Sequence, residues 1–157
     1  MEVLKLRWRD KQLLIYYLNL MKMNPVVHFE MPSKDKKRVS KFYKQAFGWG
    51  MQQMGPEMGN YILASTAETD KKGMLKKPGN INGGFFEYDP KKPGLQHPSI
   101  VISVDDIREA MKKVKKAGGK VLGGQKPGEP DDIPGVGLYV SFMDTEGNRV
   151  GMLQSTI

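Results

Sequence analysis

The chain has 157 residues and a formal net charge of +8, and 39% of its residues are hydrophobic, which suits one globular domain with a real core and excludes a disordered chain. It contains no cysteine, which excludes disulfides, thiolate metal sites and a cysteine nucleophile and is compatible with a reducing compartment, so we expect a cytoplasmic protein. The excess lysine is scattered over predicted helices and loops, without arginine clusters interleaved with aromatic residues, and we therefore expect no nucleic-acid partner.

Residues 1–22 differ from the rest of the chain. A charged start is followed by the apolar run LLIYYLNLM, which is too short to span a bilayer and is followed by no small-residue cleavage site. We interpret residues 1–22 as an N-terminal extension, with an amphipathic helix that packs on the domain or on a partner as the alternative. The domain is expected over residues 23–157, with no membrane association.

Two similar sets of elements follow in chain order. Residues 25–31 alternate between apolar and polar and predict a half-buried strand, and a helix is predicted over 36–47, between Asp35 and Gly48. Short strands are expected over 49–54, 60–66 and 81–88, before a Pro- and Gly-rich linker. The second set is a strand over 99–106, a helix from 107 that Gly118 ends, and strands over 119–124, 138–144 and 148–154.

The two sets match each other in spacing. Asp35 to Gly48 and Asp105 to Gly118 span the same distance, and the pattern Gly-Asn-x-x-Gly occurs at both 79–83 and 147–151. The sequence therefore predicts an internal duplication of a βαβββ unit, with modules over about 24–88 and 98–155. The predicted fold class is α+β, with two modules forming one curved mixed sheet around a cavity and the helices outside.

A duplicated unit that contains HFEMPSKDKKRVSKFYKQAFGW, INGG, IPGVG and DTEGNRVGMLQ resembles the vicinal oxygen chelate superfamily. That superfamily includes glyoxalase I, bleomycin resistance proteins and extradiol dioxygenases. The resemblance covers about residues 24–155 and implies the fold rather than a reaction, since one fold serves many functions. It also implies a homodimer, and an exposed edge strand in each module agrees with pairing.

Metal-dependent members of this superfamily place metal ligands on the first and fourth strands of each module. These positions fall on His28, Gly83, Ser99 (or Pro98) and Gly151, and only one of them is a good ligand. The resemblance therefore implies no metal of the usual kind and no cofactor. A metal site rebuilt from His28, Glu30, Glu87 and His97 is the alternative, because two imidazoles with carboxylates suit zinc or iron(II).

The alternation of side chains along each predicted strand indicates which residues face the cavity. It predicts that His28 and Glu30 face the cavity while Val27, Phe29 and Met31 face the helices. The expected ligand-binding residues, which share a predicted place on the cavity wall, are His28, Gly83, Phe85, Ser99, Val101, Gly151 and Leu153. His28 and Glu30 are also the candidate catalytic pair for acid/base chemistry, although His28 has the plainer interpretation of an anchor that orients a ligand.

The long connection QKPGEPDDIPGVG, residues 125–137, is expected to be either a lid with hinges at Gly135 and Gly137 or a simple linker. The function expected from the sequence is metal-independent binding of a small organic molecule in the sheet cavity. The alternatives are a metal-dependent, glyoxalase-like lyase or dioxygenase-like oxidoreductase with a rebuilt site, and a drug-sequestering resistance protein. Whether the protein is an enzyme stays open at this point.

Overall fold

The computed structural model describes residues 9, 11, 13, 23–71 and 73–156. The extension expected over residues 1–22 lies outside this range, except at three positions. Within the described part of the chain, no helix is both long and apolar enough to cross a membrane.

Each module contains the expected strand, helix and three strands. The first module consists of β1 (Val26–Ser33), α2 (Lys36–Phe47), β2 (Gly50–Gln53), β3 (Ile62–Ser65) and β4 (Asn82–Glu87), with the short 3-10 helix η1 (Pro56–Met58) between β2 and β3. A second 3-10 helix, η2 (Pro93–Leu95), lies in the linker. The second module consists of β5 (Ser99–Ser103), α3 (Ile107–Lys116), β6 (Lys120–Gly123), β7 (Asp131–Ile133), β8 (Gly137–Met143) and β9 (Arg149–Ser155). β7 is an additional strand within the predicted loop.

Helices α2 and α3 each begin at an aspartate that caps the first turn. The carboxylate of Asp35 accepts a hydrogen bond from the backbone N–H of Arg38 at 2.9 Å, and Gly48 ends α2 in the left-handed conformation with φ 69°. In α3 the cap is Asp106, whose carboxylate accepts from the backbone N–H groups of Arg108 and Glu109 at 2.9 and 3.0 Å. The sequence predicted the first cap correctly, and the second lies one residue after the aspartate expected from the spacing.

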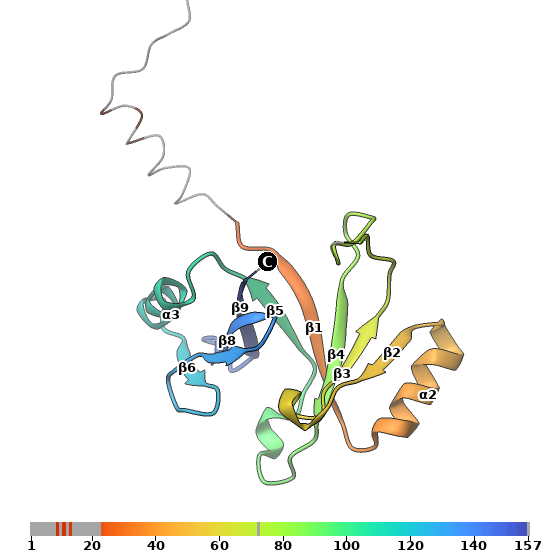
Figure 1. Ribbon diagram of the computed structural model, residues 1–157. Helices are drawn as coiled ribbons and strands as arrows, with labels where there is room; N and C mark the ends of the chain where they lie inside the picture. The colour runs from red at the N-terminus through yellow and green to blue at the C-terminus, as the bar shows by residue number, and fades with distance from the viewer. Residues whose placement is uncertain (1–8, 10, 12, 14–22, 72, 157) are drawn as a thin grey trace, which may run out of the picture.

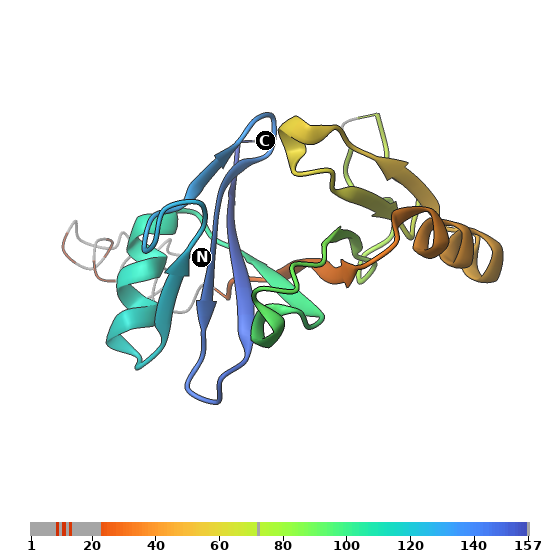
Figure 2. The same cartoon turned by 90° about the horizontal axis from the view of Figure 1, so that it is seen from below.

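The strands form one mixed sheet that joins the two modules. Its order is β2-β3-β4-β1-β5-β9-β8-β6, with β7 paired to β8. β1 pairs in parallel with β4 of its own module and antiparallel with β5 of the other, and therefore lies at the centre of the molecule (Figure 1). Seen from below, the sheet bends so that the strands of the two modules stand on opposite sides and the helices lie outside them (Figure 2). The predicted α+β class and duplication are confirmed.

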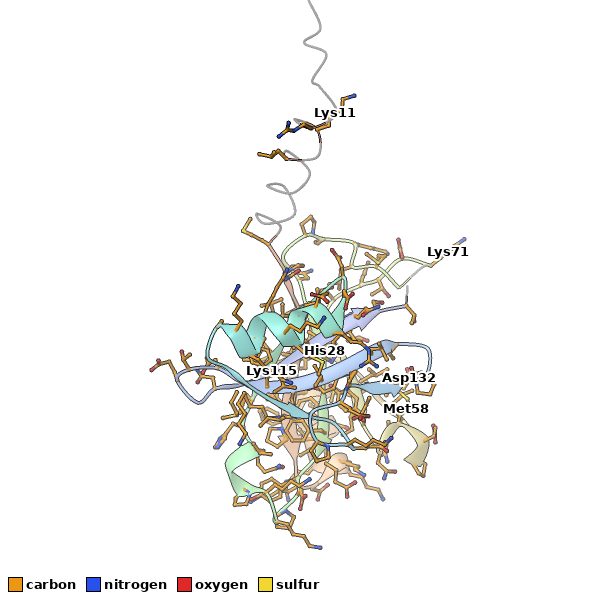
Figure 3. The ribbon with its side chains drawn as sticks, turned by 90° about the vertical axis from the view of Figure 1, so that its left-hand side faces the viewer. Lys11, His28, Met58, Lys71, Lys115 and Asp132 are labelled. Carbon is orange, nitrogen blue, oxygen red and sulfur yellow. The ribbon has the colours of Figure 1, made fainter. Side chains whose placement is uncertain are left out.

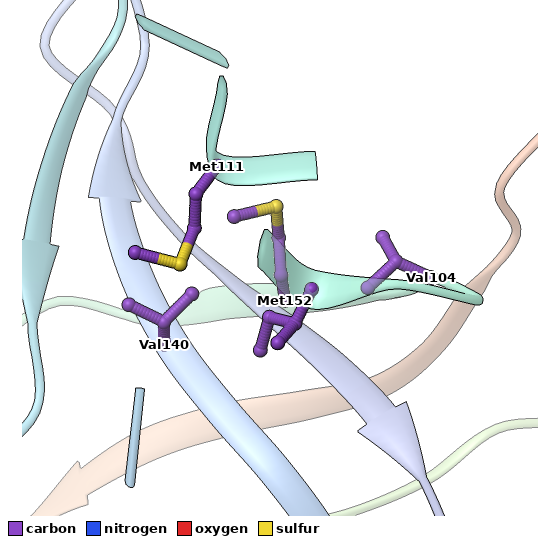
Figure 4. Close-up of a cluster of buried hydrophobic side chains, with 5 residues drawn as sticks. Val104, Met111, Val140 and Met152 are labelled. Atoms are coloured by element: carbon purple, nitrogen blue, oxygen red, sulfur yellow. The ribbon is translucent and has the colours of Figure 1, made fainter. Parts of the chain in front are cut away.

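The apolar core is divided between the modules. One cluster of buried side chains joins α3 to β8 and β9 and is drawn in Figure 4; its members are Val104, Ile107, Met111, Val140 and Met152. The other lies between α2 and the β3–β4 hairpin and contains Ile62, Ala64 and Phe85. Both clusters lie on the convex, helix-facing side of the sheet, so the concave side is outside these clusters.

Candidate functional site

A cavity of about 320 Å³ opens on the concave side of the sheet between the two modules. Its size falls at the lower end of the range for small-molecule sites. Four of the residues expected on its wall do line it: His28 and Glu30 from β1, Val101 from β5 and Leu153 from β9. The remaining walls come from η1, from the residues around Tyr61 and from the segment between β7 and β8.

Two residues of β4 expected on the cavity wall face the helix instead, and that expectation was wrong. Gly83 pairs with Phe29, and a Cβ at Gly83 would overlap the Phe29 ring on the convex side. Phe85 is only 2% exposed and belongs to the core cluster under α2. The register pairs His28 with Asn82, and side chains alternate along a strand, so the concave face of β4 carries Asn82 and Gly84.

The other two expected positions lie on the concave face but outside the cavity lining. Ser99 pairs with Glu30 and is buried, and its hydroxyl oxygen has no hydrogen-bond partner within the described residues. Gly151 pairs with Val101 and lies behind the ring of Tyr139, where a Cβ would come within 2.8 Å of the nearest ring carbon. Gly151 therefore contributes space for an aromatic side chain rather than direct ligand contact.

Glycines at two positions of the concave face make room for two tyrosine rings. A Cβ at Gly84 would overlap the ring of Tyr61 and lie 2.5 Å from the backbone carbonyl oxygen of Ile62. Gly151 makes the corresponding room for Tyr139 in the second module. Both tyrosines line the cavity, and neither was expected there from the sequence.

His28 is hydrogen-bonded to the first of these tyrosines. Its Nε2 lies 3.0 Å from the hydroxyl oxygen of Tyr61. Burial lowers the pKa of His28 below its ordinary value, because the surrounding protein disfavours the imidazolium form. At neutral pH the imidazole is therefore neutral. Burial, with a smaller effect from the nearby Glu30 carboxylate, raises the pKa of Tyr61, so its hydroxyl keeps its proton.

Glu30 is held by the second tyrosine. The hydroxyl of Tyr139 donates to Glu30 Oε2 at 2.7 Å, a bond that crosses from the second module to the first. Burial and, to a lesser degree, the Glu30 charge raise the pKa of Tyr139, whereas the charge of Arg149 acts in the opposite direction. The guanidinium of Arg149 lies 5.6 Å from the centre of the Phe86 ring, and one of its nitrogens is buried without a hydrogen-bond partner in the described structure.

The segment predicted as a lid or linker forms one wall of the cavity. The segment lines it with Asp131, Asp132, Ile133, Pro134 and Val136, and β7 pairs with β8 over Asp131 to Ile133. The carboxylate of Asp131 accepts from the backbone N–H of Gln125 at 2.8 Å, which fixes the start of the segment. Asp132 is exposed at the rim, as is Met58 of η1 in part; both are labelled in Figure 3. Movement of the 125–137 segment as a lid stays a prediction.

The described side chains on the concave face do not supply the donor set of a divalent metal. His28 already contacts Tyr61, Glu30 accepts from Tyr139, and the side-chain oxygen of Asn82 accepts from the backbone N–H groups of residues 66 and 67 at 2.8 and 3.2 Å. Within the described residues, no group of three or more His, Cys, Asp or Glu side chains could hold a metal ion. Gly84 and Gly151 carry no donor atom.

The rebuilt metal site considered as an alternative is not assembled either. His97 is exposed in the linker before β5, and it does not line the cavity. Glu87 forms an ion pair with Lys36 at 3.1 Å, outside the cavity. The two residues therefore cannot join His28 and Glu30 around one ion without rearrangement of the sheet.

Comparison with known proteins identifies the relatives of this fold. Residues 26–152 match the family model described as Glyoxalase/Bleomycin resistance protein/Dioxygenase superfamily. A glyoxylase-like domain-containing protein of Didymella fabae is 33% identical over 125 residues, which cover 76% of this chain and 84% of that protein.

Solved structures with the same fold are more distant in sequence. Streptomyces coelicolor methylmalonyl-CoA epimerase, in complex with 2-nitronate-propionyl-CoA, superposes with a TM-score of 0.63 at 13% identity, covering 87% of this chain and all of that one. A hypothetical protein from Bacillus halodurans superposes with a TM-score of 0.57 at 18% identity, covering 84% and 94%. At these identities the likeness concerns the fold alone.

Proposed function

Because the chain belongs to the Glyoxalase/Bleomycin resistance protein/Dioxygenase superfamily, we propose that it binds a small organic molecule in its sheet cavity without the metal site of metal-dependent members. The observation that supports the proposal is that two tyrosine hydroxyls, rather than further metal-ligating side chains, contact His28 and Glu30 on the concave face. Gly84 and Gly151 admit Tyr61 and Tyr139, and these rings hold His28 and Glu30 through hydrogen bonds. Among the described residues, no group of three or more His, Cys, Asp or Glu side chains could bind a metal ion instead.

The lining suits recognition of a molecule with an apolar body and a few polar groups. Leu63, Val101, Ile133 and Leu153 provide apolar contact, and the polar groups gather around His28 and Glu30. A neutral imidazole has one donor nitrogen and one acceptor nitrogen. Because Nε2 of His28 contacts Tyr61, the other ring nitrogen can offer a ligand either a donor or an acceptor, depending on the tautomer. His28 is thus the central polar anchor of the proposal.

The proposal is tested by ligand-induced stabilisation of chelator-treated protein. A metabolite panel is screened by thermal shift on wild type, on His28→Ala, and on His97→Ala as the matched control, because His97 is exposed and outside the cavity. We expect ligands that raise the melting temperature of wild type and His97→Ala but not of His28→Ala. Stabilisation that appears only after a metal is restored, or that survives His28→Ala unchanged, contradicts the proposal.

A second candidate is a proton-transfer enzyme that uses the same groups. The neutral His28 imidazole and the Glu30 carboxylate stand on one face of β1, each positioned by a tyrosine hydroxyl, and either can accept a proton. The epimerase structures with the same fold make exchange of a carbon-bound proton the reaction class to examine. Deuterium incorporation into a bound ligand, lost in Glu30→Gln or His28→Ala, distinguishes this enzyme from a binding protein.

The remaining alternatives gain no specific support. A metal-dependent lyase or dioxygenase needs donors that the described concave face lacks. A resistance protein that sequesters a bulky drug between two protomers needs a larger site than the cavity within one chain. We further propose a homodimer in the cytoplasm, supported by the edge strands β2 and β6, which pair on one side only in the described sheet, and by the absence of cysteine.

A further inference from the structure

The cavity lining has a charge opposite to that of the whole protein. Its acidic side chains are Glu30, Glu57, Asp131 and Asp132, and the lining contains no lysine or arginine among the described residues. The chain as a whole carries +8, so this segregation does not follow from composition. The carboxylates come from β1, η1 and β7, three segments far apart in the sequence that the fold brings to one opening.

The other ionisable groups at the cavity do not cancel this charge. His28 is neutral at pH 7 because burial lowers its pKa, and both tyrosines remain protonated. Arg149, whose charge acts on Tyr139, lies outside the lining and over the Phe86 ring. Even if the positive charge of Arg149 balances the negative charge of Glu30, three other carboxylates remain in the lining.

We propose that the cavity selects small organic cations, an amine or quaternary ammonium on an apolar body, and rejects anions such as the acyl-CoA ester bound by the superposable epimerase. This inference rests on the proposed function, because the cavity itself, rather than the carboxylates, defines the site. A concave, apolar-walled opening lined by one sign of charge concentrates its field and raises the local concentration of the opposite charge.

The interior of the cavity offers suitable contacts for the cationic end. Glu30 Oε2 accepts from Tyr139, and a carboxylate has further acceptor positions for an ammonium donor. Tyr61 and Tyr139 also line the cavity, and aromatic rings attract cations. The apolar body then contacts Leu63, Val101 and Leu153.

The test uses three probes of one shape and different charge: 3-phenylpropylamine, 3-phenylpropanol and 3-phenylpropionate. Binding is measured by protein-observed NMR titration on the full chain, with acetyl-CoA as a further anion. We expect the amine to bind about tenfold more tightly than the alcohol, the propionate and acetyl-CoA not to bind in the cavity, and added salt to weaken only the amine.

Charge variants assign the selectivity to the cavity. The double variant Glu57→Gln/Asp132→Asn neutralises two exposed carboxylates of the lining, and Glu68→Gln/Glu146→Gln makes the same charge change at exposed positions outside it. The first pair is expected to weaken amine binding about three- to tenfold with no effect on the alcohol, and the second to leave both unchanged.

The outcomes separate the two proposals. Equal binding of amine and alcohol, tighter binding of propionate, or equal weakening by both variant pairs overturns the cation selectivity while the cavity remains a binding site. Failure of all the probes to perturb cavity resonances at millimolar concentration overturns the selectivity alone, because the proposed function is tested separately by the metabolite screen on wild type and His28→Ala.

Discussion

Replacement of Gly84 by alanine tests whether glycine is required to admit the Tyr61 ring. Gly84 lies in β4 with an ordinary backbone conformation. In an open site, an added Cβ would therefore stabilise the protein by about 0.4–1 kcal/mol, because it reduces the conformational entropy of the unfolded chain. Here the Cβ would overlap the Tyr61 ring and lie 2.5 Å from the Ile62 carbonyl oxygen. The ring can turn aside, but the carbonyl belongs to the paired strand β3 and cannot move freely.

The overlap outweighs the entropic gain. Overpacking of a filled site costs about 1–3 kcal/mol, which corresponds to a fall in melting temperature of roughly 3–10 °C for a chain of this size. Gly94→Ala is the control, since no atom lies within 4 Å of a Cβ added there. Calorimetry should show a lower melting temperature for Gly84→Ala only, together with loss of the His28 contact in NMR spectra. A Gly84→Ala protein as stable as wild type would refute the packing argument.

Three further changes have defined outcomes. Tyr139→Phe removes the hydroxyl that donates to Glu30 and should cost about 1–2 kcal/mol by denaturant unfolding, whereas Tyr88→Phe, which loses no hydrogen bond in the described structure, should be neutral. The unfolding free energy should decrease as pH falls below about 6.5, because the pKa of His28 is lower in the folded chain than in the unfolded one. If the unfolding free energy of His28→Asn depends on pH as steeply as that of wild type, His28 is not the cause. Asp106→Ala should cost about 1 kcal/mol by removing the α3 cap, and Asp106→Asn should restore most of it; equal losses would exclude capping as the cause.

The sequence predicted the elements and one face of the site well. Local signals suffice for helix caps, such as Asp35 before α2, and for the alternation that places His28 and Glu30 on the concave face of β1. The two glycine patterns also identified the fourth strands. These features depend on residues close in the chain, where physical preference and structure agree.

The sequence was insufficient where the pairing register between distant strands determines which face of the sheet a side chain occupies. The facing of β4 was misjudged by one residue, because a run of two glycines followed by two phenylalanines has no polar alternation, and only pairing with β1 shows that Gly83 and Phe85 face the helix. Tyr61 and Tyr139 were missed, although alternation with the buried Ile62 and Val140 points both tyrosines to the concave face. Their contacts with His28 and Glu30 cross 33 and 109 residues of sequence.

The metal content of the native protein tests the central claim most directly. Protein purified without chelators is analysed by elemental mass spectrometry, in parallel with His28→Ala. The tyrosine rings that fill the space beside Gly84 and Gly151, with His28 bound to Tyr61, predict far less than one transition metal ion per chain in both proteins. One equivalent of metal in wild type that is lost in His28→Ala would contradict the claim.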